Sequence, residues 1–136
     1  MGSKGKGTRA ERELFHMFWE NNIACIRSAG SGSTTRPSSD LLAGNGEKAF
    51  AIECKSIKGK SKHFSKEEIE QLLIFSNLFG AEPIIGMRFD SKGWHFLNVN
   101  ELTSNKNGNY TINFNLCQKQ GISFKELIKE YKQTKL

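Results

Sequence analysis

Three acidic residues and one lysine in the first part of the sequence could together carry out phosphate chemistry. Glu11 lies near the start of an expected helix, and Asp40 precedes a short hairpin. The second strand of that hairpin carries Glu53, Cys54 and Lys55. Carboxylates at the end of a small sheet can hold Mg²⁺, which prefers oxygen ligands and keeps several waters, against a phosphate group. The pattern predicts metal-assisted hydrolysis of a phosphodiester.

Each of the four ionisable residues has an expected role in that reaction. We expect Asp40, Glu53 and Glu11 to be metal ligands, and the carbonyl oxygen of Cys54 could complete the coordination. Lys55 would orient the attacking water or offset the negative charge that develops on the phosphate. Mg²⁺ is the expected metal, and Mn²⁺ is an expected substitute because it accepts the same oxygen ligands. All four are therefore candidate catalytic residues.

The same residues also have explanations that involve no chemistry. Glu53 and Lys55 could be an ordinary charge pair on a solvated face of a sheet. Asp40 could simply accept a hydrogen bond within a turn. Glu11 could be the last member of a helix capping box that begins at Thr8. Their occurrence together, in one hairpin beside a basic loop, favours the metal site.

The expected strand over residues 49–56 decides which side chains can meet. Successive side chains of a strand point to opposite faces of a sheet, so Glu53 and Lys55 share one face. A tight turn through Asn45-Gly46, a pair typical of hairpins, joins this strand to the one before it. Asp40 and Glu53 are therefore expected on adjoining strands.

The remaining periodicities predict an α/β fold with a central mixed β-sheet flanked by α-helices. Helical spacing of apolar residues and capping boxes predict helices, and alternating apolar residues bounded by turn residues predict strands. The expected order is a helix over 9–21, strands over 23–28, 40–43 and 49–56, a helix over 66–79, strands over 83–89 and 93–99, a short edge strand over 110–114, and a helix over 123–132. We expect a polar loop over 29–39 and a basic loop over 58–62 between these elements.

The helix expected over 66–79 is apolar over more than one stripe. The capping box that begins at Ser65 opens it, and Gly80 is its expected C-cap. A helix with such a broad apolar surface suits burial on two sides. We expect one side to pack on its own sheet and the other against a second subunit.

The size and composition of the chain are those of one domain with a real core. It has 136 residues, of which 37% are apolar, including ten Phe and two Trp. We expect a flexible basic tail over residues 1–7, where Lys and Gly alternate, and a single nuclease domain over 8–136. The sequence contains no apolar run of roughly 18 residues, which predicts a cytoplasmic protein without membrane contact. Three cysteines without C-x-x-C spacing predict reduced core thiols.

The formal net charge is +6, and most of the excess lies in the half with the carboxylates. Residues 1–62 hold 11 Lys or Arg against 6 Asp or Glu, whereas residues 63–136 hold 9 against 8. Such a surface suits a polyanion, because neutralising phosphates releases condensed counterions. On composition alone, a merely soluble basic surface is an equal alternative.

Five blocks of sequence resemble the archaeal-type Holliday junction resolvases, which belong to the restriction-endonuclease-like nuclease superfamily. The blocks are KGTRAEREL (6–14), IRSAGSGS (26–33), DLLAGNG (40–46), AIECK (51–55) and IFSNLFG (74–80). They follow the family's order and spacing, and the likeness weakens after Trp94. One departure is Ser39, where the wider superfamily often has Pro before the acidic residue.

The resemblance implies a homodimer with two active sites that cuts paired strands of a four-way DNA junction and leaves ligatable ends. By position, Glu11, Asp40, Glu53 and Lys55 correspond to the family's active-site residues. This agrees with the roles that the residue types predict.

The resemblance also assigns DNA and subunit contacts. Arg12 and Arg27 match basic residues beside the scissile phosphate, and Ser31 matches a serine of a flexible loop. Phe75 and Phe79 match aromatic positions at the family's subunit contact. We further expect Lys6 and Arg9, at the basic N-terminus, to bind DNA.

The leading hypothesis is a structure-selective, Mg²⁺-dependent endonuclease that resolves Holliday junctions in recombination and repair. One alternative is a related nuclease of the superfamily that acts on flaps or duplex DNA. Another is a catalytically silent DNA-binding module with the same fold. The silent module is disfavoured because all four active-site positions hold competent residues.

Overall fold

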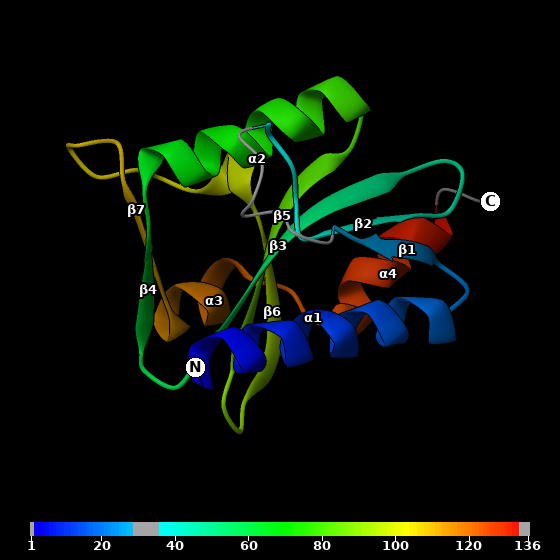
Figure 1. Ribbon diagram of the computed structural model, residues 1–136, viewed down its shortest axis with the longest axis horizontal. Helices are drawn as coiled ribbons and strands as arrows, with labels where there is room; N and C mark the ends of the chain where they lie inside the picture. The colour runs from blue at the N-terminus through cyan, green and yellow to red at the C-terminus, as the bar shows by residue number, and fades with distance from the viewer. Residues whose placement is uncertain (1, 29–35, 134–136) are drawn as a thin grey trace.

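A five-stranded sheet forms the centre of the protein (Figure 1). The structure is a computed structural model that describes residues 2–28 and 36–133. The strand order is β1-β2-β3-β5-β6. The strands are β1 (Ala24–Arg27), β2 (Leu41–Gly44), β3 (Ala49–Ile57), β5 (Glu82–Phe89) and β6 (Gly93–Asn98).

The sheet is mixed, which confirms the predicted fold class. β3 and β5 are parallel, and the other neighbouring pairs are antiparallel. The β2–β3 turn is built on the expected Asn-Gly pair. Asn45 Oδ1 accepts from the N–H groups of Glu47 and Lys48, both at 2.9 Å, and Gly46 has a φ of 97°. That left-handed conformation suits glycine, which has no Cβ to clash.

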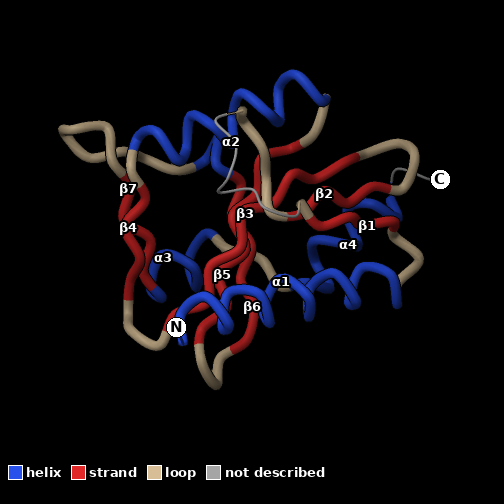
Figure 2. Tube along the Cα trace, viewed as in Figure 1, coloured by secondary structure: helices blue, strands red, loops and turns tan. Residues whose placement is uncertain are grey.

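Helices cover both faces of the sheet, as Figures 1 and 2 show. The helices are α1 (Gly2–Glu20), α2 (Lys66–Phe79), α3 (Phe114–Gln120) and α4 (Phe124–Gln133). One hydrophobic cluster packs α1 and α4 on the sheet through Leu14, Phe18 and Leu127. A second cluster packs α2 and α3 through Leu72 and Cys117.

Strand β3 contributes to both clusters because its side chains alternate. Phe50 and Ile52 are buried in the cluster under α1, and Ala51 is buried in the cluster under α2. The three cysteines are free and buried. Both results agree with the sequence-based predictions.

The caps predicted for α2 are confirmed. Ser65 Oγ accepts from the N–H of Glu68, and the Glu68 carboxylate accepts from the N–H of Ser65. Gly80 ends the helix with a φ of 89°, and its N–H donates to the carbonyl of Ser76.

The N-terminus differs from the prediction. Helix α1 begins at Gly2, so the segment expected to be a flexible tail is helical from residue 2 onward. Thr8 lies within this helix, and the capping box expected there was wrong. Ala10, Leu14 and Phe18 are buried against the sheet. A helix nucleated by such packing can extend toward its N-terminus, since each further residue adds a hydrogen bond at the cost of one residue's freedom.

A second, two-stranded sheet was only partly predicted. The expected basic loop is shorter than predicted, because β4 (Ser61–Phe64) begins within it and pairs with β7 (Tyr110–Asn113). The strand expected near 110 therefore joins β4 and not the edge of the central sheet. Helix α3 was missed, although Asn113 supplies a local signal as its N-cap by accepting from the N–H of Leu116 at 2.8 Å.

Helix α2 keeps an apolar surface that the rest of the described chain does not cover. Ile74, Leu78 and Phe79 are 44%, 84% and 55% exposed. Phe75 is half-buried and stacks on Phe79, with ring centroids 5.7 Å apart. This agrees with the prediction that the helix has two apolar sides. Among the described residues, no helix is both long and apolar enough to cross a membrane.

Candidate active site

Asp40 is held directly opposite the β3 strand by hydrogen bonds. It precedes β2, whose Leu41 pairs with Ile52. The Cys54 N–H donates to Asp40 Oδ2 at 2.9 Å, and the Ser28 N–H donates to the Asp40 carbonyl at 2.9 Å. These bonds tie Asp40 to both neighbouring strands, so its carboxylate has a fixed position. The carboxylate partner is therefore the backbone of β3 and not a local turn.

The residue before Asp40 helps to fix this position. Ser39 is buried, and its hydroxyl donates to the Leu41 carbonyl at 2.8 Å. The hydroxyl ties together the residues on each side of Asp40. Ser39 therefore constrains this backbone through a hydrogen bond, at the position where the wider superfamily often has the ring of a proline.

Glu53 and Lys55 share a face of β3, as the alternation predicts. Lys55 Nζ lies 3.9 Å from Glu53 Oε2, and the two side chains are 29% and 27% exposed. Glu53 follows Ile52, the partner of Leu41, so the strand register brings Glu53 level with Asp40. The hairpin thus places two carboxylates and the lysine together.

Glu11 joins the site from helix α1. Arg27, the last residue of β1, donates from Nη2 to Glu11 Oε1 at 3.4 Å. The negative charge of Asp40 and the positive charge of Lys55 both act on the Glu11 carboxyl. Its partner is a residue of the sheet and not a helix cap, so the local explanation for Glu11 fails. The packing of α1 positions Glu11, because Leu14, one turn later, is buried.

All three carboxyl groups have raised pKa values, and burial is the largest cause for each. Burial, and then the negative charge of Asp40, raise the pKa of Glu53 to about 8. Burial raises the pKa of Asp40 despite the Cys54 N–H and the charges of Lys55 and Arg27. Burial and Asp40 also raise the pKa of Glu11. A divalent cation at this place would offset the repulsion and lower all three values.

The donor set fits a hard cation that keeps its waters. Within the described ranges, no three His, Cys, Asp or Glu side chains already form a closed metal-binding group. Mg²⁺ does not need one, because it is usually bound through one or two carboxylates together with waters and substrate phosphates. Asp40 and Glu53 are the two best-placed ligands, and Glu11 is near enough that its charge acts on Glu53 and the charge of Asp40 acts on it.

The other predicted contact residues are placed less completely. Arg9 and Arg12 are exposed on α1, and Arg27 lies beside Glu11. Lys6 is in α1, but its side chain is outside the described part, as is all of Ser31. The role of each in DNA binding stays a prediction.

Sequence reasoning missed a second polar cluster near this site. Glu13 of α1 accepts from Arg88 of β5 and from Trp94 of β6, at 2.9 and 2.6 Å. These residues are 75 and 81 positions from Glu13 along the chain. No local spacing pattern could have predicted contacts of that range.

A mixed sheet between helices, with acidic residues and a lysine on adjoining strands, defines a restriction-endonuclease-like α/β protein. A family model described as archaeal Holliday junction resolvase (Hjc) matches residues 2–136. The chain belongs to this family.

Individual relatives agree with the family match. The crossover junction endodeoxyribonuclease Hjc of Archaeoglobus fulgidus is 42% identical over 99 residues, covering 73% of each protein. The enzyme of the same name from Methanocaldococcus jannaschii is 34% identical over 132 residues, covering 96% of this chain and 92% of the relative. The solved structure of A. fulgidus Hjc superposes with a TM-score of 0.81 at 35% identity, covering 89% of this chain and 98% of that one.

Proposed function

We propose that this protein is a structure-selective endonuclease that resolves four-way DNA junctions by paired symmetric nicks, with Mg²⁺ as its metal. The observation that carries the proposal is the convergence of Asp40, Glu53 and Glu11 with Lys55 at one end of the sheet. The convergence occurs in a chain whose family and relatives carry junction-resolving names. Recombination and repair are the processes in which such junctions arise.

The residues of the site divide the work of phosphodiester hydrolysis. A bound divalent cation would neutralise phosphate oxygens and make a water more acidic. Asp40 and Glu53 would hold that cation, and the Cys54 N–H keeps the Asp40 carboxylate aimed at it. Lys55, held near Glu53, would orient the water or offset negative charge on the phosphate. Arg27 would contact the scissile phosphate while keeping Glu11 in place.

We further propose that the protein acts as a homodimer joined through α2. Two nicks placed symmetrically on a junction require two active sites, and a two-fold dimer supplies them. The exposed apolar residues Ile74, Leu78 and Phe79 support α2 as the contact, and Phe75 stacks on Phe79. Burying such a patch removes apolar surface from water.

One assay tests the proposed activity. Labelled four-way junction, flap and linear duplex are incubated with the protein, with and without Mg²⁺ or Mn²⁺. We expect paired symmetric nicks on the junction only, and only with metal. Equal cleavage of duplex would favour a less selective nuclease, and binding without any cut would favour a silent module.

A further inference from the structure

A small cavity lies close to the candidate active site, on the other face of the sheet. Its volume is about 220 Å³, and it is lined by Arg9, Ala10, Glu13, Ser56 and Arg88. Since a water molecule occupies roughly 30 Å³, the cavity has room for several waters or for a phosphate group. Its lining includes two guanidinium groups and one hydroxyl, which suits an anion.

The cavity is next to the carboxylate site along both elements that build it. On β3, Ser56 directly follows Lys55, and on α1, Ala10 directly precedes Glu11. The side chain of Ser56 points to the opposite face of β3 from that of Lys55, so the cavity adjoins the carboxylate site through α1, where Glu11 follows Ala10.

Arg88 is held in one orientation by Glu13. Its Nε donates to Glu13 Oε1 at 2.9 Å and its Nη2 donates to Glu13 Oε2 at 3.4 Å. The Trp94 Nε1–H donates to the same carboxylate at 2.6 Å, which fixes Glu13 in turn. Because a guanidinium has five N–H groups and Glu13 engages two, three are left to bind another acceptor.

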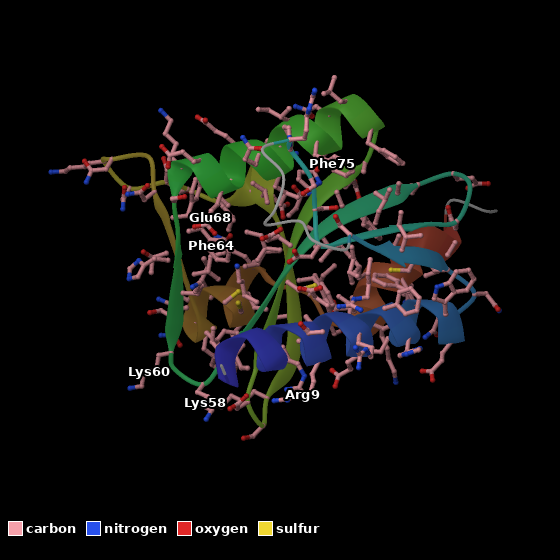
Figure 3. The ribbon with its side chains drawn as sticks, viewed as in Figure 1. Arg9, Lys58, Lys60, Phe64, Glu68 and Phe75 are labelled. Atoms are coloured by element: carbon pink, nitrogen blue, oxygen red, sulfur yellow. The ribbon has the colours of Figure 1, made fainter. Side chains whose placement is uncertain are left out.

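The charges of the cavity favour an anion in spite of Glu13. The Arg88 and Trp94 hydrogen bonds lower the pKa of Glu13, so the group is a carboxylate whose charge is matched by Arg88. Arg9 is exposed and adds a second positive charge. Lys58 and Lys60 are exposed in the turn after β3, and they lie with Arg9 along the lower edge of the molecule in Figure 3.

A larger hollow on the protein does not have this character. Its volume is about 470 Å³, and its polar lining includes Glu82 and Glu101 against a single cation, Lys48. A polyanion would be repelled there. Of these two cavities, the smaller one has the lining that suits an anion.

We propose that Arg9, Ser56 and Arg88 form a phosphate-binding site that holds one backbone phosphate of the DNA strand next to the phosphate that is cut. The proposal rests on the proposed function, because it assigns the DNA strand to this path. Glu13 is a positioning residue that acts through Arg88. The site contributes to the affinity for DNA and to the position of the protein along the strand, and it makes no contact with a base.

Salt-dependent junction binding tests the site in solution. Each phosphate contact contributes about one to the slope of log affinity against log salt. We expect Arg88→Gln to reduce that slope by roughly one and to weaken binding by about tenfold at low salt. Arg9→Gln, at an exposed helix position, should act in the same direction and leaves the Glu13–Arg88 pair intact. Lys125→Gln on α4 is the charge-matched control and should leave the slope as in the parent.

A neutral phosphate in the DNA locates the contact. Junctions carrying a single methylphosphonate at successive positions beside the cut site are bound to the parent and to Arg88→Gln. We expect a methylphosphonate at one position to weaken binding to the parent but not to weaken binding to Arg88→Gln any further, because both changes remove the same contact. Additive losses at every position would overturn the proposal.

The remaining outcomes are also decisive. If Arg88→Gln lowers the melting temperature but neither Arg88→Gln nor Arg9→Gln changes the salt slope, the Glu13–Arg88 pair only fastens α1 to the sheet and the phosphate site is refuted. If the parent cuts junctions but both variants have the same salt slope as the parent, the phosphate site is refuted and the proposed function stands. If the parent cuts no junction, the proposed function fails, and the slopes measured on linear duplex still test the phosphate site.

Discussion

At the scale of single residues, the site concentrates negative charge in a half-buried place. Burial raises the pKa of Asp40, Glu53 and Glu11, and the negative charge of Asp40 raises the pKa of the other two further. Lys55 and Arg27 offset part of this charge. A fold that holds carboxylates so close is less stable without a cation than it would be with neutral side chains. The arrangement is one that metal binding would stabilise.

Removing one metal ligand should separate cleavage from binding. Asp40→Asn and Glu53→Gln keep the side-chain shape but lose the charge that would hold the cation. We expect nicking of the junction to fall by at least about a hundredfold, from the size of the electrostatic contribution lost. Junction affinity should be unchanged or higher, since less negative charge faces the phosphates. Glu47→Gln, exposed in the β2–β3 turn, is the control, and parental cleavage by either ligand variant would refute the metal assignment.

The raised pKa of Glu53 predicts how stability depends on pH without metal. Because this pKa is about 8 in the fold and the ordinary value is 4.5, the folded state keeps a proton that the unfolded state loses. The stability that protonated Glu53 contributes to the fold is therefore complete below pH 4.5 and is lost as pH rises to about 8. We expect the melting temperature of the parent in chelator to fall more steeply than that of Glu53→Gln over this range. Added Mg²⁺ should stabilise the parent most at the alkaline end, and parallel curves would contradict the prediction.

At the scale of secondary structure, turns and helix caps made by nearby residues fix the strands that carry the site and the helix α2. The Asn45 turn sets the register of β2 on β3, and this register places Asp40 level with Glu53. The reciprocal hydrogen bonds of Ser65 and Glu68 open α2. Such caps satisfy N–H groups that have no partner within the helix.

Loss of the α2 cap should weaken the fold without altering the site. Ser65→Ala removes the hydroxyl that accepts from the Glu68 N–H. We expect the free energy of unfolding to fall by about 1 kcal/mol, measured by urea titration, with nicking unchanged in the folded protein. Ser104→Ala, in an exposed loop, should stay within about 0.5 kcal/mol of the parent. Equal effects of the two substitutions would show that the cap contributes nothing.

At the scale of the whole molecule, two surfaces outside the carboxylate site have proposed roles, one in DNA binding and one in dimer formation. The cavity at Arg9 and Arg88 lies next to the carboxylates, on the path proposed for the DNA strand. The apolar surface of α2 lies on the other side of the sheet from α1. If two protomers join through α2, the α1 face stays uncovered, and Glu53 and Lys55 lie on the α2 face of β3, just beyond Ile52, the last residue paired with β2.

Shortening the aromatic residues of α2 should weaken the dimer. Phe75→Ala with Phe79→Ala removes the stacked pair from α2, of which Phe79 is exposed and Phe75 is half-buried. We expect sedimentation velocity to give more monomer at micromolar concentrations, together with unpaired nicks on the junction. Ile26→Ala, which removes an apolar side chain 62% exposed on β1, is the control. An unchanged dimer in the double variant and a weakened one in Ile26→Ala would move the contact to β1.

Local patterns were sufficient to predict the central elements and the part of the candidate active site that lies on the β2–β3 hairpin. The alternation of β3 predicted that Glu53 and Lys55 share a face, and the Asn-Gly turn predicted the hairpin that carries Asp40. The capping box and the glycine at the end of α2 predicted its limits. Each of these features depends on residues a few positions apart, so each can be recognised without knowing the fold.

Only the tertiary structure decided the features that join distant segments. Helix α1 packs on the sheet through Leu14 and Phe18 and continues back to Gly2, where Lys and Gly residues alone predicted a flexible tail. The pairing of β4 with β7 and the approach of Arg88 to Glu13 join segments that are far apart along the chain. Periodicity reports which face of an element is buried but not what lies against it. The sequence alone therefore predicted which carboxylates and which lysine form the candidate site, and folding decided which other charges surround them.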